Sequence, residues 1–284
     1  MKRVCSLLLL LLLCVGSVLT LASCGEKKIR IALPNDTTNE ARALLLLEAN
    51  GLIRLNPDAG LLATTRDITE NPYHIEFVEI EAAQLPRTLP DVDYAVINSN
   101  YAIDAGLNPT KDALAVENSY SAYSNLLAVR EGNENSAKTR ALVAALSSER
   151  VKTFITETYG GGVLGVVETT GDGYDATLDY AVLSGTKIVV AASPTPHAEI
   201  LEIAKEILKE KNITLEVRLF TDYVQPNNVT ESGEVDANYF QHLPYLENFN
   251  EEKGTHIVSV LAVHVEPMGI YSNKYTKLDE IKAK

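Results

Sequence analysis

Two aromatic side chains, an asparagine and a histidine stand close together in one stretch, Asp236-Ala-Asn-Tyr-Phe-Gln-His-Leu-Pro-Tyr-Leu246. Flat apolar rings beside single polar groups are what a small-molecule pocket uses. Pro244 removes a backbone donor and breaks a regular helix or central strand, so we expect these side chains on a short turn or at a helix start. The same composition also fits core aromatics, Tyr239, Phe240 and Tyr245, beside a surface histidine, His242.

The sequence offers little for covalent catalysis. It has no Gly-x-Ser-x-Gly motif and no Walker phosphate loop, and Gly160-Gly-Gly-Val-Leu-Gly165 is only a weak match to a nucleotide loop because no clear helix follows it. His264 and Glu266, two apart on an expected strand, could hold zinc together with His242. No histidine-rich loop supports that metal site. We therefore predict that the protein is not an enzyme and uses no cofactor or bound metal.

Two strand–loop–helix units of one design would position these residues. An apolar strand at Ile29–Leu33 leads through several possible N-caps into a helix at Glu40–Asn50. A second strand at Lys187–Ala192 leads into a helix that runs to about Lys211 with apolar residues at three-and-four spacing. These patterns predict two α/β lobes, each with a mostly parallel sheet. Further strands are expected at Ile75–Ile80, Asp93–Ile97, Asn125–Arg130, Leu215–Phe220 and Ile257–Val263, and one long helix or two at Ser136–Tyr159.

The N-terminus reads as a secretory leader. A basic start is followed by an apolar run, Ser6–Ala22, which is shorter than the roughly 20 residues of a transmembrane helix. Leu21-Ala-Ser-Cys24 resembles a bacterial lipoprotein cleavage box, with Cys24 as the lipid-modified residue. A retained membrane anchor is the competing interpretation. Because Cys5 and Cys14 leave with the leader, a mature chain with one cysteine has no disulfide and no thiolate metal site.

Size and charge narrow the class of protein further. The chain beyond the leader is longer than one ordinary core holds, so two lobes are expected. A formal net charge of −13 argues against a nucleic-acid partner and against an anionic membrane surface. A composition of 46% hydrophobic and 22% charged residues is that of a folded globular protein.

Several separate motifs resemble the NlpA/MetQ family, the methionine-binding lipoproteins of bacterial ABC importers. Besides the stretch at 236–246, these are Phe220-Thr-Asp-Tyr-Val-Gln-Pro226 and His264-Val-Glu-Pro-Met-Gly-Ile-Tyr271. More distant matches are Pro34–Leu47, Glu81–Arg87 and Ala95–Asn98, and together they cover nearly all of 29–159 and 187–284. The resemblance implies a two-lobed periplasmic-binding-protein-like fold (type II) with a ligand cleft between the lobes.

An amino-acid pocket of this kind needs three sorts of partner, and the chain has residues for each. Arg42, near the start of its helix, offers a bidentate guanidinium to a carboxylate. Asn98 and Asn125, at strand ends, offer amide oxygens to an ammonium. An aromatic wall suits a thioether, and the resemblance supports the same set. The predicted ligand-binding residues are Arg42, Asn98, Asn125, Tyr223, Tyr239, Phe240 and His242, of which Tyr239 stands at a more variable family position.

The order of the two halves departs from the family. In relatives, the half resembling 187–284 follows the signal peptide and the half resembling 29–159 comes second, so this chain reads as a circular permutation. Residues 160–186 would then join the family's usual ends. We expect a leader at 1–23, a lipid-anchor tether at 24–28, lobe one at 29–132 plus 263–284, and lobe two at 133–262 including the linker 160–186.

The resemblance and the residues together predict a lipid-anchored substrate-binding protein of the cell membrane that faces the periplasm or the extracellular side. It would bind L-methionine between its lobes and deliver it to an ABC permease and its ATPase. Two alternatives stay open: the same fold could bind another amino acid or a methionyl dipeptide, or the chain could be a surface lipoprotein that binds a partner.

Overall fold

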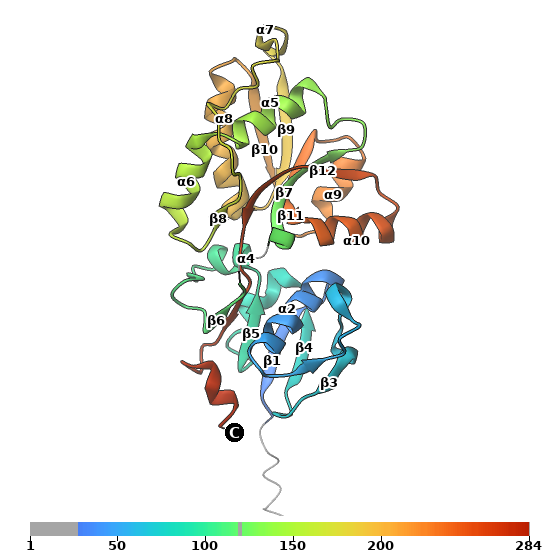
Figure 1. Cartoon of the computed structure of the whole chain (residues 1–284), viewed down its shortest axis with the longest axis vertical. Coiled ribbons are helices and arrows are strands. Elements are labelled where there is room, and N and C mark those ends of the chain that lie inside the picture. The colour runs from blue at the N-terminus through green and yellow to red at the C-terminus, as the bar shows by residue number, and fades with distance from the viewer. Residues whose placement is uncertain (1–27, 119–120, 284) are drawn as a thin grey trace, which may run out of the picture.

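The computed structural model describes residues 28–118 and 121–283 of the chain. These residues form two α/β lobes stacked end to end, with the chain's C-terminus and residue 28 both on the lower lobe (Figure 1). The predicted leader at 1–23, Cys24 and nearly all of the tether lie outside the described residues.

Lobe one is built on a five-stranded sheet in the order β4-β1-β5-β13-β6. Strands β4, β1 and β5 run parallel, whereas β13 is antiparallel to both of its neighbours. Its strands are β1 (Arg30–Pro34), β4 (Glu76–Ile80), β5 (Tyr94–Ile97), β6 (Ala115–Val116) and β13 (Gly269–Tyr271), with a small β2 (Arg54–Leu55) and β3 (Ile68–Glu70) pair beside them. Its helices are α2 (Thr37–Ala49), α3 (Leu85–Thr88) and α4 (Ser99–Asp104), with 3₁₀ turns at Gly60–Leu62, Thr65–Asp67, Ala82–Gln84 and Leu278–Ile281.

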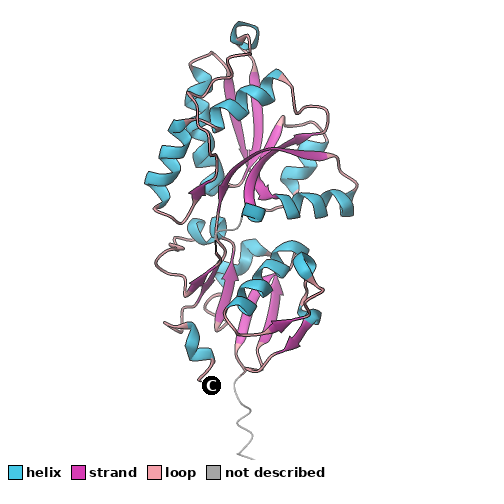
Figure 2. Cartoon of the chain, in the orientation of Figure 1, coloured by secondary structure: helices cyan, strands magenta, loops and turns pink. Residues whose placement is uncertain are grey.

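Lobe two is built on a six-stranded sheet in the order β10-β9-β11-β7-β12-β8. Helices cover both faces of this sheet (Figure 2). Its strands are β7 (Ser124–Arg130), β8 (Leu164–Gly165), β9 (Lys187–Ala192), β10 (Thr214–Leu219), β11 (Ala237–His242) and β12 (Ile257–Val265). Its helices are α5 (Ala137–Leu146), α6 (Glu149–Tyr159), α7 (Tyr180–Leu183), α8 (Glu199–Lys209), α9 (Gln225–Glu231) and α10 (Leu243–Lys253), with short turns at Ser121–Tyr123 and Pro194–Ala198.

Both predicted strand–loop–helix units are present, β1 and α2 in lobe one and β9 and α8 in lobe two. Helix α2 begins after Asp36, whose side chain accepts a hydrogen bond from the Asn39 backbone N–H at 3.1 Å. Such a cap satisfies one of the free donors at a helix start. Helix α8 buries its apolar stripe against the sheet of lobe two, as its three-and-four spacing predicts; the buried residues are Ile200, Leu201, Ala204, Ile207 and Leu208.

The sheets are parallel only in part. In lobe two, β10, β9 and β11 run parallel, while β7, β12 and β8 are antiparallel to their neighbours. The α/β class is as expected, and the parallel portions are the strand–helix units that the sequence pattern identifies. Apart from β8, the antiparallel strands β6, β7, β12 and β13 flank the chain's passages between lobes, and periodicity does not orient them.

The lobe boundary also differs from the expected one. Strand β7 was expected in lobe one, ending at 132, but it pairs with β11 and β12 inside the sheet of lobe two. Strand β12 stays in lobe two up to Val265, and the chain then returns to lobe one at β13. The chain thus changes lobes between β6 and β7 and again between β12 and β13, because backbone pairing rather than sequence position assigns a strand to a sheet.

The expected linker, residues 160–186, is packed onto lobe two. The Tyr174 hydroxyl donates to the Ile207 carbonyl at 3.2 Å, and Lys211 Nζ lies 4.3 Å from the centre of the Tyr174 ring. Arg140 forms an ion pair with Asp175 at 2.7 Å. The segment is therefore an ordered part of the lobe.

Across residues 28–118 and 121–283, no helix combines the length and the apolar character that a membrane span requires.

Candidate functional site

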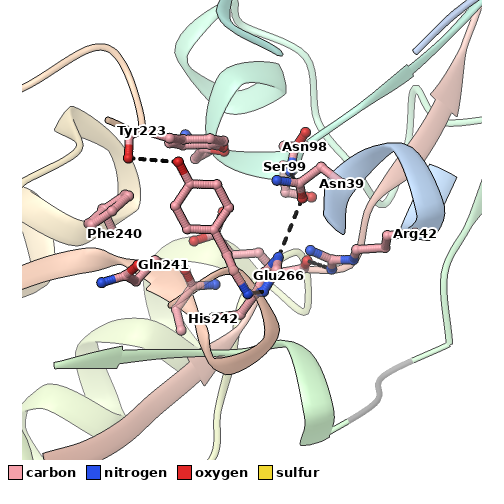
Figure 3. A pocket seen from close by; sticks show the side chains of 12 residues that line it. Asn39, Arg42, Asn98, Ser99, Tyr223, Phe240, Gln241, His242 and Glu266 are labelled. Carbon is pink, nitrogen blue, oxygen red and sulfur yellow. Dashed lines mark hydrogen bonds between the residues drawn. The ribbon is translucent and has the colours of Figure 1, made fainter. Parts of the chain in front are cut away.

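A polar pocket lies where the two lobes meet. Lobe one supplies residues from α2 and from the end of β5, while lobe two supplies the start of β7 and the end of β11 (Figure 3). The lining residues are Asn39, Arg42, Asn98, Ser99, Asn100, Asn125, Tyr223, Phe240, Gln241, His242, Tyr245 and Glu266. Six of the seven predicted ligand-binding residues line this pocket, and Tyr239 does not.

Tyr239 lies next to an irregularity of β11. The pairing of β11 with β7 shifts register between Tyr239 and Gln241, so the usual alternation of side chains is interrupted at Phe240. Phe240, Gln241 and His242, which follow the shift, all line the pocket, whereas Tyr239 does not. Its ring packs against His197 and His264 with centres 4.8 and 5.4 Å apart. The side chain is fully buried in the core of lobe two, so Tyr239 is a core residue and not a wall of the cleft.

An aromatic wall forms one side of the pocket. The ring of Tyr223 lies 5.9 Å from Phe240 and 5.9 Å from Tyr245. The Tyr223 hydroxyl donates to Asn100 Oδ1 at 2.7 Å, which ties this wall to lobe one. Tyr245, which the sequence analysis considered only as core, in turn donates to the Tyr223 carbonyl at 2.9 Å. The result is a flat apolar surface with its polar tips already paired.

His242 stands at the junction of β11 and α10. It is the N-cap of α10: its Nδ1 accepts the Tyr245 backbone N–H at 3.2 Å. Burial lowers the pKa of His242 well below its usual value, so the ring is neutral and carries its proton on Nε2. Nε2 lies 3.4 Å from Asn39 Oδ1. The stretch around Pro244, where a turn or a helix start was predicted, is therefore the end of β11 followed directly by the start of α10.

Arg42 is already engaged on one edge. Its Nε and Nη2 contact the Glu117 carboxylate at 2.9 and 2.5 Å, and Nη2 also donates to the Glu266 carbonyl at 2.8 Å. The guanidinium carbon lies 4.4 Å from the centre of the Tyr123 ring. These contacts hold the head group where the two passages between lobes meet. Of the five guanidinium N–H groups, those of Nη1 lie outside these contacts.

Asn98 presents an unused acceptor. Its Nδ2 donates to Asn39 Oδ1 at 2.8 Å, which fixes the orientation of the amide. Its Oδ1 is buried and has no hydrogen-bond partner among the described residues. Because an unpaired buried acceptor costs free energy, this oxygen suits a donor such as the ammonium of a ligand.

Asn125 is oriented differently from the sequence expectation. We expected its amide oxygen to meet an ammonium, but Asn125 Oδ1 lies 3.0 Å from His197 Nε2. His197 is 72 residues away in the sequence. Nothing in local periodicity pairs the two residues, which is why the sequence analysis missed this contact.

A buried carboxylate, that of Glu266, also lines the pocket. Glu266 Oε1 is 2.7 Å from His264 Nε2 and 3.3 Å from His197 Nε2. The zinc alternative named His264, Glu266 and His242; the structure places His197 in the third position, with ligand atoms of the three residues within 4.8 Å of one another. Burial lowers the pKa of His197 and of His264 to about 3 and raises that of Glu266. Neutral imidazoles that donate to a carboxylate account for this cluster.

The pocket contains little free space. The space that the centre of a water-sized sphere can reach is about 20 Å³, while one water needs roughly 10–15 Å³ on this measure. A ligand of amino-acid size therefore requires the lobes to move apart first.

A polar pocket between two α/β lobes, joined by two short passages of the chain, defines a binding protein of the hinge-closing kind. The family model described as NlpA lipoprotein matches residues 20–167 and 188–284. The chain belongs to the NlpA lipoprotein family.

Individual relatives match a shorter part. The chain is 52% identical over 132 residues to membrane lipoprotein TpN32 of Treponema pallidum, covering 46% of this chain and 49% of that protein. It is 43% identical over 137 residues to D-methionine-binding lipoprotein MetQ of Escherichia coli, covering 48% and 51%. The chain thus spans about half the length of the curated relatives that it matches. A solved nutrient binding protein from Burkholderia cenocepacia bound to methionine is 48% identical, with a TM-score of 0.46 over 48% of this chain and 57% of that one.

Proposed function

We propose that this chain is a lipid-anchored substrate-binding protein of an ABC importer, and that it holds L-methionine between its two lobes. The observation that carries the proposal is the buried, unpaired Asn98 Oδ1 in a pocket that also contains Arg42 and an aromatic wall. An acceptor, a cation and a polarisable apolar surface match the ammonium, the carboxylate and the thioether of methionine.

Capture needs no covalent step. The ligand enters while the lobes are apart, and closure about the two passages removes it from water. In the closed pocket each polar contact is stronger because little solvent competes for it. The tyrosine wall receives the side chain, since sulfur packs well against aromatic rings.

The names of relatives support methionine as the ligand. Relatives 43–44% identical to this chain carry the name D-methionine-binding lipoprotein MetQ. Since each covers only about half of this chain, the ligand of the whole protein is a proposal and both enantiomers belong in the test. Another amino acid and a methionyl dipeptide are the alternatives for the same cleft.

The order of the halves bears on delivery to the permease and its ATPase. We infer a circular permutation: the family model matches two separate segments, whereas each relative's alignment covers about one half. When two proteins carry the same two halves in opposite order, one continuous alignment can match only one of those halves. The anchor at Cys24 would then enter the molecule at lobe one, the lobe that residue 28 joins (Figure 1). We expect ligand binding to be retained, because the same pocket residues come together in the permuted order. Docking to the permease is the function that the changed anchor position would impair first.

Calorimetric titration tests the ligand. The chain from Gly25 onward is unfolded and refolded to strip bound ligand, then titrated with L-methionine, D-methionine, leucine, glycyl-methionine and zinc. We expect tight methionine binding that is lost in Arg42→Ala and weakened in Asn98→Ala. The matched control is Leu243→Ala, a residue on the exposed surface at 43% accessibility.

Other outcomes separate the alternatives. If the folded protein binds only the dipeptide, the proposed fold stands and the substrate is a methionyl dipeptide instead of methionine. Folded protein that binds none of these ligands overturns the proposal and favours a partner-binding lipoprotein. Transport by the full lipoprotein in vesicles that contain the permease, at the rate of a relative with the usual order, would show that docking is not impaired.

A further inference from the structure

A chain of buried polar side chains that starts at Glu266 in the pocket wall has no part in the proposal above. Glu266 is followed by His197 and His264, and Tyr239 closes the far end. Each is at most 5% exposed. Fully paired buried polar networks hold their side chains in one geometry, so this network fixes the orientation of the pocket side chain that it contacts.

The carboxylate decides which nitrogen of His197 carries hydrogen. His197 Nε2 faces two oxygens, Glu266 Oε1 at 3.3 Å and Asn125 Oδ1 at 3.0 Å. A nitrogen lone pair in that position would be repelled by the carboxylate, whereas an N–H is attracted to it. The other nitrogen, Nδ1, has no hydrogen-bond partner by distance among the described residues, but the Thr195 backbone carbonyl acts as an acceptor for the ring and raises its pKa. A charged carboxylate attracts an N–H more strongly than a neutral carbonyl does, so the proton is placed on Nε2.

The His197 proton then sets the direction of the Asn125 amide. An N–H donor pairs with the amide oxygen, so Oδ1 turns toward His197 and Nδ2 remains for the pocket that Asn125 lines. An amide NH₂ group donates two hydrogen bonds and accepts none. Asn125 therefore cannot receive an ammonium, but it can donate to a carboxylate oxygen.

We propose that Glu266 and His197 are positioning residues that hold Asn125 as a hydrogen-bond donor to the ligand's carboxylate, while Asn98 Oδ1 receives the ammonium. This proposal rests on the proposed function as far as the ligand is an amino acid. It reverses the role that strand-end position alone suggests for Asn125. It also makes the site discriminate against ligands whose carboxylate is reduced or absent.

Two ligands that differ only at the carboxylate test the proposal. The full chain is titrated with L-methionine and with L-methioninol, which keeps the ammonium and the thioether. In Glu266→Gln and His197→Phe we expect methionine affinity to fall about tenfold or more, the usual scale for one charge-assisted bond. Affinity for methioninol should change by less than about threefold, because its contacts avoid Asn125. The selectivity ratio is thus the readout, and loss of fold would lower both affinities alike.

Tyr239→Phe is the matched control. It removes a hydrogen bond from the same network, at His264 Nδ1, and leaves the Glu266–His197–Asn125 contacts in place. We expect its methionine to methioninol ratio to equal that of the unchanged protein. Equal losses for the two ligands in Glu266→Gln would instead show that Glu266 binds the ammonium directly or only supports the fold, and would overturn the proposal.

A ligand-free measurement keeps the proposal separate from the proposed function. Long-range ¹H–¹⁵N correlation spectra of histidine-labelled protein report which ring nitrogen carries the proton. His197 should show the Nε2–H form, and Glu266→Gln should convert it into a mixture of the two forms. An Nδ1–H form in the unchanged protein overturns the relay whether or not methionine binds. If neither ligand binds and the Nε2–H form is present, the proposed function fails while the orientation of Asn125 stands.

Discussion

The buried ion pair of Arg42 and Glu117 should be among the strongest couplings in the molecule. The side chains are 4% and 9% exposed, and the Glu117 carboxylate also accepts the Met268 backbone N–H at 3.2 Å. Removing one partner of such a pair leaves an uncompensated buried charge and typically costs about 3–5 kcal/mol. Replacing both removes the stranded charge together with the attraction. We therefore expect Arg42→Met and Glu117→Met each to lower the free energy of unfolding by about 3–5 kcal/mol, and the double variant by at least about 2 kcal/mol less than their sum.

Urea unfolding followed by far-ultraviolet circular dichroism measures these costs, because the sequence has no tryptophan to report by fluorescence. The matched control is the exposed pair of Arg54 and Glu70, 3.3 Å apart with side chains 68% and 63% exposed. Water and salt screen such a pair, so its double-variant cycle should show little coupling. If the Arg42 and Glu117 costs add within about 0.5 kcal/mol, the two residues act independently and the reasoning from burial is refuted.

Two further predictions concern the buried histidines and the linker at 160–186. The pKa of His197 and of His264 falls to about 3 from 6.5, so the unfolded chain takes up protons first as the pH drops below 6.5. Stability is full above that pH and should fall by about 2 kcal/mol per imidazole between pH 7 and 5; Glu266, whose pKa is raised, opposes this loss once it titrates. Urea unfolding at both pH values checks the slope, and a flat profile would contradict buried neutral histidines. Gly173→Ala should destabilise the protein by about 1–3 kcal/mol, because its φ is +98° and a Cβ would lie 2.7 Å from an isoleucine of α8. Gly171→Ala meets nothing within 4 Å and is the control; equal melting temperatures for the two would show that the segment is not packed as described.

Local sequence patterns predict the strands and helices whose ends line the pocket. They do not predict which polar atoms of the pocket form hydrogen bonds with one another. Asn39 and Arg42 share a face of α2 because they are three residues apart, and the capping pattern before that helix predicts its start. The carboxylate that holds Arg42 is 75 residues away, and the imidazole that orients Asn125 is 72 residues away. Neither has a signal in periodicity or spacing. Glu117 is the only charged residue between Ala113 and Ser121, and nothing in that stretch predicts a buried carboxylate.

The sequence by itself determined the α/β class, the two lobes and the family, since these follow from short-range spacing and from motifs that each fit within a few residues. It also predicted six of the side chains that line the pocket, because strand ends and helix starts gather at one edge of each sheet. Only the tertiary structure decided the polarity of the site. Whether Asn125 donates or accepts depends on His197 and Glu266, and how much of Arg42 remains for a ligand depends on Glu117. Hydrogen-bond direction is a property of atoms brought within about 3 Å by the packing of the whole chain, and no local pattern in the sequence encodes it.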